Sequence, residues 1–307
     1  MAAQQLFIGI DAGGTKTACM AVAGRSKAMV AGGPGNLFGV GRTGFAVLLR
    51  GLVKALRARG RIDARQAASV CVGGAGLGRR RERAAARTIV AKLFPRAHVA
   101  VVDDATLFLW AAFGPDEPGI ALIAGTGSMC IGRDGAGRTA RAGGWGPLLG
   151  DPGSAFALGR RAIAHALAVR DGIEKPSPLA RAVTRHFGVA GALDVLSRIG
   201  VGGPAAVASF APRVLRAASR GERTAARIVA EEAAALGSFV KGVAVQLGAR
   251  PRAVACGGGL FANSYYAGAA ARAIRATAGA GRVFVPRVRP VQGAIAIARA
   301  QVTHAAH

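Results

Sequence analysis

The segment LFIGIDAGGTKT, residues 6–17, is an apolar run followed by a short turn rich in glycine and threonine. A second segment, GIALIAGTGS at residues 119–128, repeats this design, and another apolar run follows each turn. We therefore predict two β-hairpins, the first with strands over 6–10 and 18–23. Glycine permits positive φ and close approach of a ligand, and the amides and hydroxyls of such turns bind phosphate oxygens. The pair predicts a site for a nucleotide.

Asp11 adds a carboxylate at the first turn. A carboxylate beside phosphates indicates Mg²⁺, bound directly or through water. Neither segment fits the phosphate-binding loop GxxxxGK[ST], because strand-like apolar residues rather than a helix follow each turn. The alternative interpretation is two ordinary hairpins that bind nothing.

The remaining pattern predicts an α/β fold. Further strands are expected over 27–31, 69–73, 98–102, 253–256 and 283–285, and helices over 43–59, 79–93, 105–113, 154–169, 178–187, 204–218, 223–247, 265–278 and 291–301. The segment GPDEPG at 114–119 is typical of a domain boundary, which gives domains of residues 1–115 and 116–307. Because the second hairpin restarts the pattern, we predict two ribonuclease H-like domains with an active-site cleft between them.

The 307 residues suffice for two domains with cores of their own. The formal charge of +26 is compatible with nucleic-acid binding. Arginines are, however, spread through nearly every predicted helix with few aromatic residues around them, so we favour a compositional bias and no nucleic-acid partner. No apolar run is long enough to span a membrane and residues 1–5 lack a basic signal-peptide start, so we expect a cytoplasmic protein without a membrane partner. The four scattered cysteines lack a CxxC pair and predict buried thiols.

Five motifs occur in one order: IDAGGTKT at 10–17, VVDDAT at 101–106, IAGTGS at 123–128, AGGWGPLLGDPGSA at 142–155 and ACGGGLFANS at 255–264. In these motifs the chain resembles the N-acetylglucosamine and glucosamine kinases of the BadF/BadG/BcrA/BcrD ATPase family, within the actin/hexokinase/Hsp70 superfamily. The resemblance covers nearly the whole chain, and GGWGPLLGDPGSA is its most specific part. It implies two actin-like ATPase domains, a last helix over about 290–304 that packs on the first domain, and a homodimer.

The resemblance implies an ATP- and Mg²⁺-dependent kinase that phosphorylates the 6-hydroxyl of N-acetylglucosamine or glucosamine. Asp104 is the candidate base, because it lies where an apolar strand gives way to a helix, and phosphoryl transfer to a hydroxyl needs a carboxylate to accept the proton. The family's base belongs to an Asp-Ala pair, which here is Asp104-Ala105. The alternative role of Asp104 is a helix cap, and Asp103 is the next candidate base.

The resemblance also supplies residues for both ligands. It assigns the sugar to Asn36, Asp104, Ser128, Gly144, Trp145, Gly146 and Asp151. It assigns the nucleotide to Gly13, Gly14, Thr15, Lys16, Gly125, Thr126, Gly127, Gly221, Gly257, Gly258, Gly259 and Asn263, with Asp11 holding Mg²⁺ through water. The alternative roles are structural: Asn36 as a turn former, Trp145 as a core residue and Asp151 as the start of a helix.

Other functions remain open from the sequence. An ATPase activator of a 2-hydroxyacyl-CoA dehydratase would hold an iron–sulfur cluster, but no cysteine lies in a suitable Gly/Cys loop pair. The ROK kinases and repressors usually carry a CxCGxxGCxE block and an ExGH motif, which the sequence lacks. A non-catalytic sugar or nucleotide sensor would bind without turnover.

Overall fold

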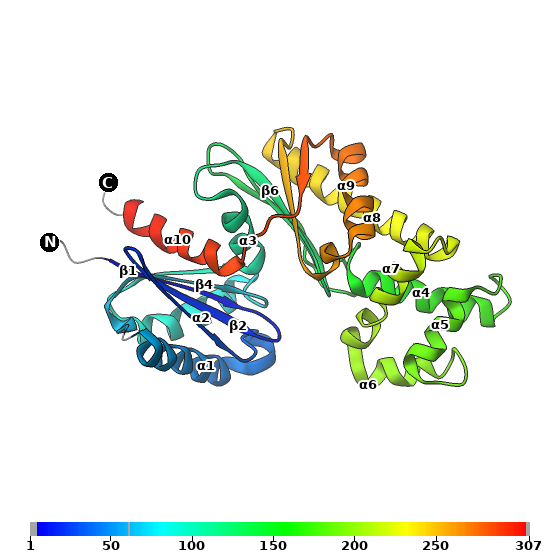
Figure 1. Cartoon of the computed structure of the whole chain (residues 1–307), viewed down its shortest axis with the longest axis horizontal. Helices are drawn as coiled ribbons and strands as arrows, with labels where there is room; N and C mark the ends of the chain where they lie inside the picture. The colour runs from blue at the N-terminus through cyan, green and yellow to red at the C-terminus, as the bar shows by residue number, and fades with distance from the viewer. Residues whose placement is uncertain (1–4, 61, 305–307) are drawn as a thin grey trace. The chain divides into compact units, whose positions relative to one another are not determined.

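The computed structural model describes residues 5–60 and 62–304, which form two five-stranded sheets with flanking helices (Figure 1). These sheets belong to two compact units. Unit 1 comprises the described residues up to Glu117 and those from Arg287 onward, and unit 2 spans Pro118–Pro286. Both sheets are mixed, so the predicted α/β class is confirmed.

The sheet of unit 1 has the strand order β3-β2-β1-β4-β5. Its strands are β1 (Leu6–Ala12), β2 (Thr17–Ala23), β3 (Ser26–Gly32), β4 (Ala67–Gly74) and β5 (His98–Asp103). The first three strands pair antiparallel, whereas β1, β4 and β5 run parallel. The carboxyl ends of the three parallel strands therefore meet at one edge of the sheet.

Helices cover both faces of this sheet. They are α1 (Leu37–Gly60), α2 (Arg80–Leu93), α3 (Asp104–Phe113) and α10 (Pro290–His304), with a 3₁₀ turn η1 (Ala64–Gln66) before β4. One core joins the sheet to α1 and α2, and a smaller apolar cluster joins the opposite face to α3 and α10. In Figure 1 the red α10 lies beside α3, although the whole of unit 2 separates them in the sequence.

Strand β1 shows why two helical layers can cover it. Ile8 and Ile10 are buried in the core with α1 and α2, whereas Phe7 packs in the cluster with α10. A Cβ added to Gly9, which shares the face of Phe7, would lie 2.8 Å from the backbone nitrogen of Ile295. Glycine thus lets α10 lie directly on the strand. Asp11 follows on this same face.

The sheet of unit 2 has the order β10-β9-β6-β7-β8. Its strands are β6 (Gly119–Ala124), β7 (Ser128–Arg133), β8 (Thr139–Gly143), β9 (Ala253–Gly257) and β10 (Arg282–Phe284). As in unit 1, three strands pair antiparallel and two further strands run parallel to the first. The predicted duplication is therefore visible in the topology.

Most of unit 2 is helical. Its helices are α4 (Ala155–Arg170), α5 (Pro178–Phe187), α6 (Val195–Ala208), α7 (Ala211–Ser219), α8 (Arg223–Leu247) and α9 (Ser264–Ala278), with a 3₁₀ turn η2 (Gly259–Ala262). One continuous core joins these helices to the sheet. It includes Leu122 of β6, Phe210 before α7 and Tyr266 of α9, all fully buried.

Two local features differ from the predictions. Strand β8 was not predicted, because TARAG is short and its apolar residues are alanines, which are uncommon in strands; pairing with β7 makes it a strand. The helix expected over 204–218 is divided between α6 and α7 around Ser209 and Phe210. Pro204 does start a helical segment, since Gly203 before it has φ 59° and kinks α6.

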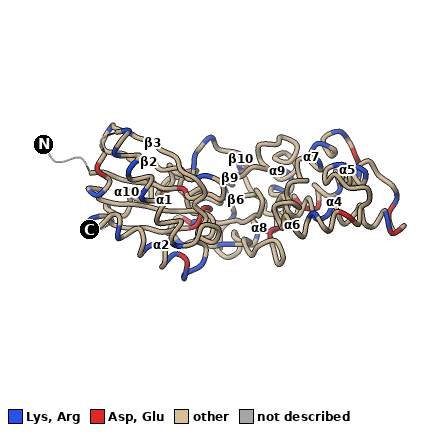
Figure 2. The backbone as a smooth tube through the Cα atoms, turned by 90° about the horizontal axis from the view of Figure 1, so that it is seen from below, with Lys and Arg blue, Asp and Glu red and all other residues tan. Residues whose placement is uncertain are grey.

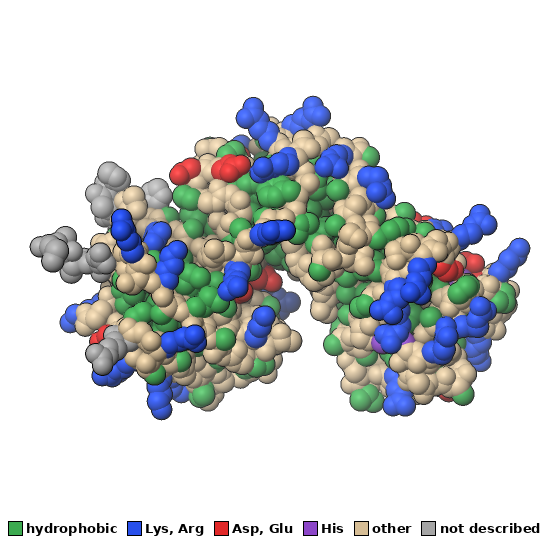
Figure 3. All heavy atoms as spheres, in the orientation of Figure 1, with side chains coloured by type: hydrophobic (Ala, Val, Ile, Leu, Met, Phe, Trp, Pro, Cys, Tyr) green, Lys and Arg blue, Asp and Glu red, His purple; other side chains and the backbone are tan. Residues whose placement is uncertain are grey.

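Lysine and arginine residues are distributed along both units rather than gathered on one element (Figure 2), and their side chains are scattered over the face seen in Figure 3. This distribution agrees with the compositional interpretation of the net charge. Across residues 5–60 and 62–304, no helix combines the length and the apolar character needed to cross a membrane. All four cysteines are free and buried, as the sequence predicted.

Candidate active site

The adjacent carboxylates at the end of β5 have different surroundings. Asp103 is buried and its Oδ1 accepts a 2.7 Å hydrogen bond from the backbone nitrogen of Thr106, so Asp103 is the N-cap of α3. Asp104 is the first residue of the helix and is half-buried, with Oδ1 accepting from the nitrogen of Ala105 at 3.1 Å. The capping role considered for Asp104 therefore belongs to Asp103.

Asp11 and Asp104 lie on one face of the sheet of unit 1. Asp11 pairs in register with Gly73 of β4, and Gly73 pairs with Val102 of β5, two residues before Asp104. The pKa of Asp11 is raised to about 6: burial raises it most, the charge of Asp104 also raises it, and the charge of Lys16 lowers it. An excess of negative charge is thus concentrated at the carboxyl edge of the parallel strands.

The carboxylate of Asp11 fits a magnesium ion. Mg²⁺ is bound in many phosphate-transfer sites by one or two carboxylates together with substrate phosphates and water. Asp11 supplies one such carboxylate, and a cation beside it would offset the burial and the Asp104 charge that raise its pKa.

The first hairpin turn, residues 13–16, extends from this same edge. Gly14, Thr15 and Lys16 are exposed, and the nitrogen of Gly13 donates to the carbonyl of Lys16 at 3.1 Å. Gly13 and Gly14 do not adopt the positive φ that glycine permits. A Cβ on Gly13 would instead lie 2.7 Å from the carbonyl oxygen of Lys16, so close approach within the turn is the reason for glycine there.

Asn36 starts α1 in unit 1. Its Oδ1 accepts from the nitrogen of Phe38 at 3.0 Å, and its carbonyl accepts from the nitrogens of Gly39 and Val40. The turn-forming role considered for Asn36 is therefore present in the structure. A Cβ on Gly76 would overlap Asn36 Oδ1, which places Asn36 beside the loop after β4.

The second hairpin turn, residues 125–127, is joined to the start of α4. The carbonyls of Gly125 and Thr126 accept from the nitrogens of Ala155 at 2.8 Å and Phe156 at 3.3 Å. Thr126 itself is exposed, whereas Ser128 is buried and its hydroxyl donates to the carbonyl of Pro152 at 2.5 Å. The main contact of Ser128 is therefore with the 151–154 turn.

Asp151 lies at the centre of the predicted sugar cluster. It is 6% exposed, and its carboxylate accepts from the backbone nitrogens of Gly146, Ser128 and Trp145. Burial raises the pKa of Asp151, whereas these hydrogen bonds and the charge of Arg141 lower it. Asp151 also has φ 58°, a left-handed conformation that is uncommon outside glycine and that recurs at functional sites.

The loop from Trp145 to Gly150 is an apolar surface feature. Trp145 is 71% exposed with Arg141 over its ring, which rules out the core role considered for it. Leu148 and Leu149 are also exposed, and Leu148 lines a groove of about 330 Å³ with residues of α4 and α6. Gly144 and Gly146 have φ of 72° and 89°, conformations that glycine adopts without strain.

Glycines 257–259 lie beside the second hairpin turn. Gly257 is in register with Ile123 of β6, and a Cβ on Gly258 would overlap the carbonyl oxygen of Ala124. A Cβ on Gly125 would lie 4.0 Å from the nitrogen of Gly259. The structure therefore brings these predicted nucleotide residues together.

Two other residues predicted to bind the nucleotide, Asn263 and Gly221, lie outside the second hairpin turn and the 257–259 glycines. Asn263 is the N-cap of α9, with Oδ1 accepting from the nitrogen of Tyr266 at 3.0 Å. Gly221 lies in the exposed turn between α7 and α8 with φ 84°. Among the contacts found in the described part of the chain, none joins Gly221 to the other predicted residues.

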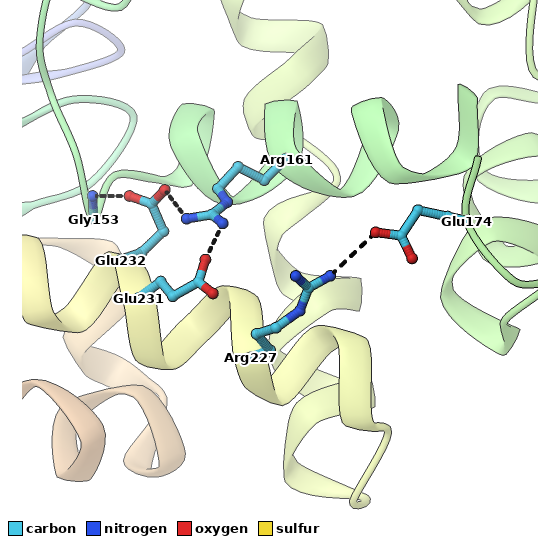
Figure 4. Close-up of polar contacts among 6 residues, drawn as sticks. All are labelled: Gly153, Arg161, Glu174, Arg227, Glu231 and Glu232. Carbon is cyan, nitrogen blue, oxygen red and sulfur yellow. Dashed lines mark hydrogen bonds and ion pairs between the residues drawn. The ribbon is translucent and has the colours of Figure 1, made fainter. Parts of the chain in front are cut away.

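A polar cluster behind the 151–154 turn was missed by the sequence analysis (Figure 4). Glu232 of α8 accepts from the backbone nitrogen of Gly153, and Arg161 of α4 pairs with both Glu232 and Glu231. The signal available in the sequence was weak: Glu231-Glu232 interrupts a run of alanines in α8. Nothing in the spacing connects that pair with Gly153, which precedes it by 79 residues.

Known proteins resemble this chain over much of its length. An N-acetylmuramic acid/N-acetylglucosamine kinase from Clostridium acetobutylicum is 34% identical over 164 residues, which are 52% of this chain and 53% of that protein. An N-acetyl-D-glucosamine kinase from Dictyostelium discoideum is 27% identical over 205 residues, 63% of this chain and 64% of that protein. The matched region thus spans between about half and two thirds of these relatives.

A solved structure extends the comparison to the whole fold. It is the crystal structure of a protein from Chromobacterium violaceum that has been proposed to be an N-acetylglucosamine kinase. It is 25% identical, covers 95% of this chain and 98% of its own, and superposes with a TM-score of 0.75. Residues 8–298 of the present chain match the BadF/BadG/BcrA/BcrD ATPase family. The family predicted from the motifs is therefore confirmed, and the chain belongs to the BadF/BadG/BcrA/BcrD ATPase family.

Proposed function

We propose that this protein is an ATP-dependent amino-sugar kinase that phosphorylates the 6-hydroxyl of N-acetylglucosamine or glucosamine. The observation that carries the proposal is the difference between Asp103 and Asp104. Asp103 caps α3, whereas Asp104 is half-buried at the strand edge, where its charge acts on Asp11. The named activities of the two relatives support the same reaction class.

In the proposed reaction, the 6-oxygen of the sugar attacks the γ-phosphorus of ATP. The bond between that phosphorus and the oxygen bridging to the β-phosphate breaks, and ADP leaves. The proton of the hydroxyl passes to the carboxylate of Asp104. Asp104 is the first residue of α3, at the carboxyl end of β5, where its carboxylate would accept this proton.

The nucleotide contacts in this proposal come from exposed turns. Gly14 and Thr15 of the first turn, and Thr126 of the second, offer backbone amides and hydroxyls for phosphate oxygens. Gly258 and Gly259 are exposed beside the second turn, where the lack of side chains leaves room for the nucleoside. Asp11 would hold Mg²⁺, which when bound neutralises charge on the phosphates.

The sugar contacts in this proposal combine one aromatic ring with polar groups. The exposed face of Trp145 suits the apolar face of a pyranose, and the carboxylate of Asp151 would accept hydrogen bonds from sugar hydroxyls. The amide nitrogen of Asn36 is not required for its turn and would donate to the sugar. We further propose that the protein works in the cytoplasm without a nucleic-acid partner, and that it forms a homodimer. Size-exclusion chromatography would test the homodimer.

An assay of ADP release with Mg-ATP tests the proposal. The acceptors are N-acetylglucosamine, glucosamine, N-acetylmuramic acid, glucose and none. We expect turnover with one amino sugar, and its loss by at least about a hundredfold in Asp104→Asn, the low end of the contribution of a general base. Asp103→Asn is the matched control, because asparagine is also a good N-cap, and it should keep its activity.

Other outcomes would change the conclusion. ADP release that is equal with and without sugar would indicate an ATPase. Ligand-dependent thermal stabilisation without turnover would indicate a sensor. Full activity of Asp104→Asn together with inactive Asp103→Asn would move the base to Asp103.

A further inference from the structure

Both backbone polar groups of Gly153 are bound by buried side chains from distant helices. Its nitrogen donates to Oε2 of Glu232 at 2.5 Å, and its carbonyl accepts from the hydroxyl of Tyr266. Glu232 is 5% exposed and Tyr266 is fully buried. Polar groups at such depth lose their hydration, so each has a strong reason to keep this partner.

Glu232 is fixed from its other side as well. Arg161 Nη1 lies 3.4 Å from Glu232 Oε1, and the same guanidinium pairs with the more exposed Glu231, as Figure 4 shows. One oxygen of Glu232 thus faces Arg161 and the other faces Gly153. The pair of carboxylates gives a natural comparison, since only Glu232 reaches the 151–154 turn.

The contacts to Gly153 fall in a turn that is held at every residue. Ser128 binds the carbonyl of Pro152, and the side chain of Ser154 accepts from the nitrogen of Ala157 at 3.1 Å as the N-cap of α4. The nitrogen of Ser154 donates to the carbonyl of Asp151 at 3.3 Å. Asp151, at the start of the turn, has the left-handed φ that would relax without such support.

We infer that Glu232 and Tyr266 are positioning residues for sugar recognition: by holding Gly153 from both sides they keep Asp151 in its left-handed conformation, with its carboxylate between the second hairpin and the Trp145 loop. Neither residue touches the sugar in this proposal. The inference rests on the proposed function, because it gives Asp151 a role in sugar binding. It predicts that sugar affinity depends on two residues whose own contacts are entirely within the protein.

The test compares Tyr266→Phe with Tyr265→Phe in the full-length protein. Each variant loses one hydroxyl, but only Tyr266 binds Gly153. We expect Tyr266→Phe to raise the KM for the sugar at least about tenfold, with the KM for ATP changed less than about twofold. Tyr265→Phe should leave both values unchanged. A Tyr266→Phe variant that shifts both KM values equally, or neither, would overturn the inference.

Glu232 provides a second test with a built-in rescue. Glu232→Ala removes the acceptor for the nitrogen of Gly153 and should raise the KM for the sugar at least about tenfold. Glu232→Gln keeps an amide oxygen that can accept and should recover most of that loss. Glu231→Gln, which weakens the same arginine pair without reaching the turn, is the control. Equal effects of Glu231→Gln and Glu232→Ala would mean that only the ion pair matters.

A double-mutant cycle tests whether the effect passes through Asp151. Added to Asp151→Asn, Tyr266→Phe should raise the KM for the sugar by less than about twofold, because the group it positions is already changed. Multiplicative effects would show that Tyr266 acts elsewhere.

Hydrogen exchange separates this inference from the proposed function, since it needs no substrate. Amides of residues 145–154 should exchange at least about fivefold faster in Tyr266→Phe than in Tyr265→Phe. If the wild-type protein showed no sugar-dependent turnover but this difference appeared, the kinase proposal would fail while the positioning role remained. Unchanged exchange in an active enzyme would overturn the positioning role alone.

Discussion

The carboxylate of Asp151 occupies the space beside Gly127 that a side chain would need. A Cβ added to Gly127 would lie 2.5 Å from Oδ2 of Asp151. Glycine at position 127 is therefore required by a residue of the predicted sugar cluster, whether or not a ligand also approaches it. Gly127 and Asp151 belong to two different sequence motifs, and this contact joins them physically.

We expect Gly127→Ala to displace the Asp151 carboxylate. Overpacking at such a position costs about 1–3 kcal/mol of stability. It should also raise the KM for the sugar about tenfold, because the carboxylate can no longer accept from the amides of Trp145 and Gly146. Steady-state kinetics and urea unfolding would measure the two effects.

Gly125→Ala is the matched control for this substitution. A Cβ at Gly125 meets its nearest atom at 4.0 Å, and φ there lies outside the left-handed range. Its stability should therefore change by less than about 0.5 kcal/mol. A loss of stability in Gly125→Ala equal to that in Gly127→Ala would contradict the role of the Asp151 contact.

The raised pKa of Asp11 predicts a pH-dependent stability in the protein without Mg²⁺ or nucleotide. Because the pKa in the fold is about 6, above the ordinary value of an aspartate, the fold favours the protonated carboxyl. The resulting stability is fully present below about pH 4 and is lost as the pH rises through about 6. The loss at pH 8 is about 3 kcal/mol, at 1.4 kcal/mol for each pH unit of difference.

Asp11→Asn should remove this pH dependence. Compared with the wild type, the variant should be more stable at pH 8 and similar at pH 4, as measured by urea unfolding at both values. It should also need more Mg²⁺ for turnover. Equal pH profiles of the two proteins would show that Asp11 ionises without cost to the fold.

The exposure of Trp145 predicts that its effect on binding is separate from its effect on stability. Trp145→Ala should change the free energy of unfolding by less than about 0.5 kcal/mol, as for most surface substitutions. It should raise the KM for the sugar about tenfold if the ring binds the apolar face of the pyranose. Calorimetric titration of the sugar would measure this directly.

Leu149→Ala, in the same exposed loop, is the comparison for Trp145→Ala. It removes apolar surface without removing an aromatic ring, so sugar affinity should fall less. Unaltered affinity in Trp145→Ala would remove Trp145 from the sugar site.

Removal of each of the two carboxylates at the end of β5 should change the stability of the protein by a different amount. Asp103→Ala deletes the N-cap of α3 and should cost about 1 kcal/mol of unfolding free energy. Asp104→Ala should cost less, because Asp104 is not the cap and its charge opposes that of Asp11. Thermal unfolding of both variants would measure these losses of stability. A larger loss of stability in Asp104→Ala than in Asp103→Ala would reverse the assignment of the cap.

The sequence was sufficient where strong local signals coincide. The predicted bounds of α8, Arg223–Leu247, are those found, because Glu222 caps its start and Gly248 ends it in a left-handed conformation. The two hairpins were found for the same reason, since their apolar strands and glycine turns repeat. In contrast, the alternation in TARAG is short and rests on two alanines, so the signal is weak, and pairing with β7 makes the segment β8.

The candidate site was predictable in its members but not in its internal contacts. Asp103 and Asp104 are identical in type, and only the hydrogen bond to Thr106 distinguishes the cap. The turn glycines were interpreted as permitting positive φ and close approach of a ligand, whereas at Gly13 and Gly127 neighbouring atoms of the protein leave no space for a Cβ. Glu232 and Tyr266 could not be connected with Gly153, because their contacts arise from packing of α8 and α9 against a distant turn.

The position of α10 determines when unit 1 can be completed during synthesis. A Cβ on Gly293 of α10 would overlap the carbonyl oxygen of Leu107, so the helix lies directly against α3. The ribosome makes this helix only after all of Pro118–Pro286. The whole of unit 2 is therefore synthesised before unit 1 is complete. The nascent chain therefore carries an open apolar surface around Cys71 and Leu107 until α10 is made, and transiently exposed apolar surface of this kind promotes aggregation.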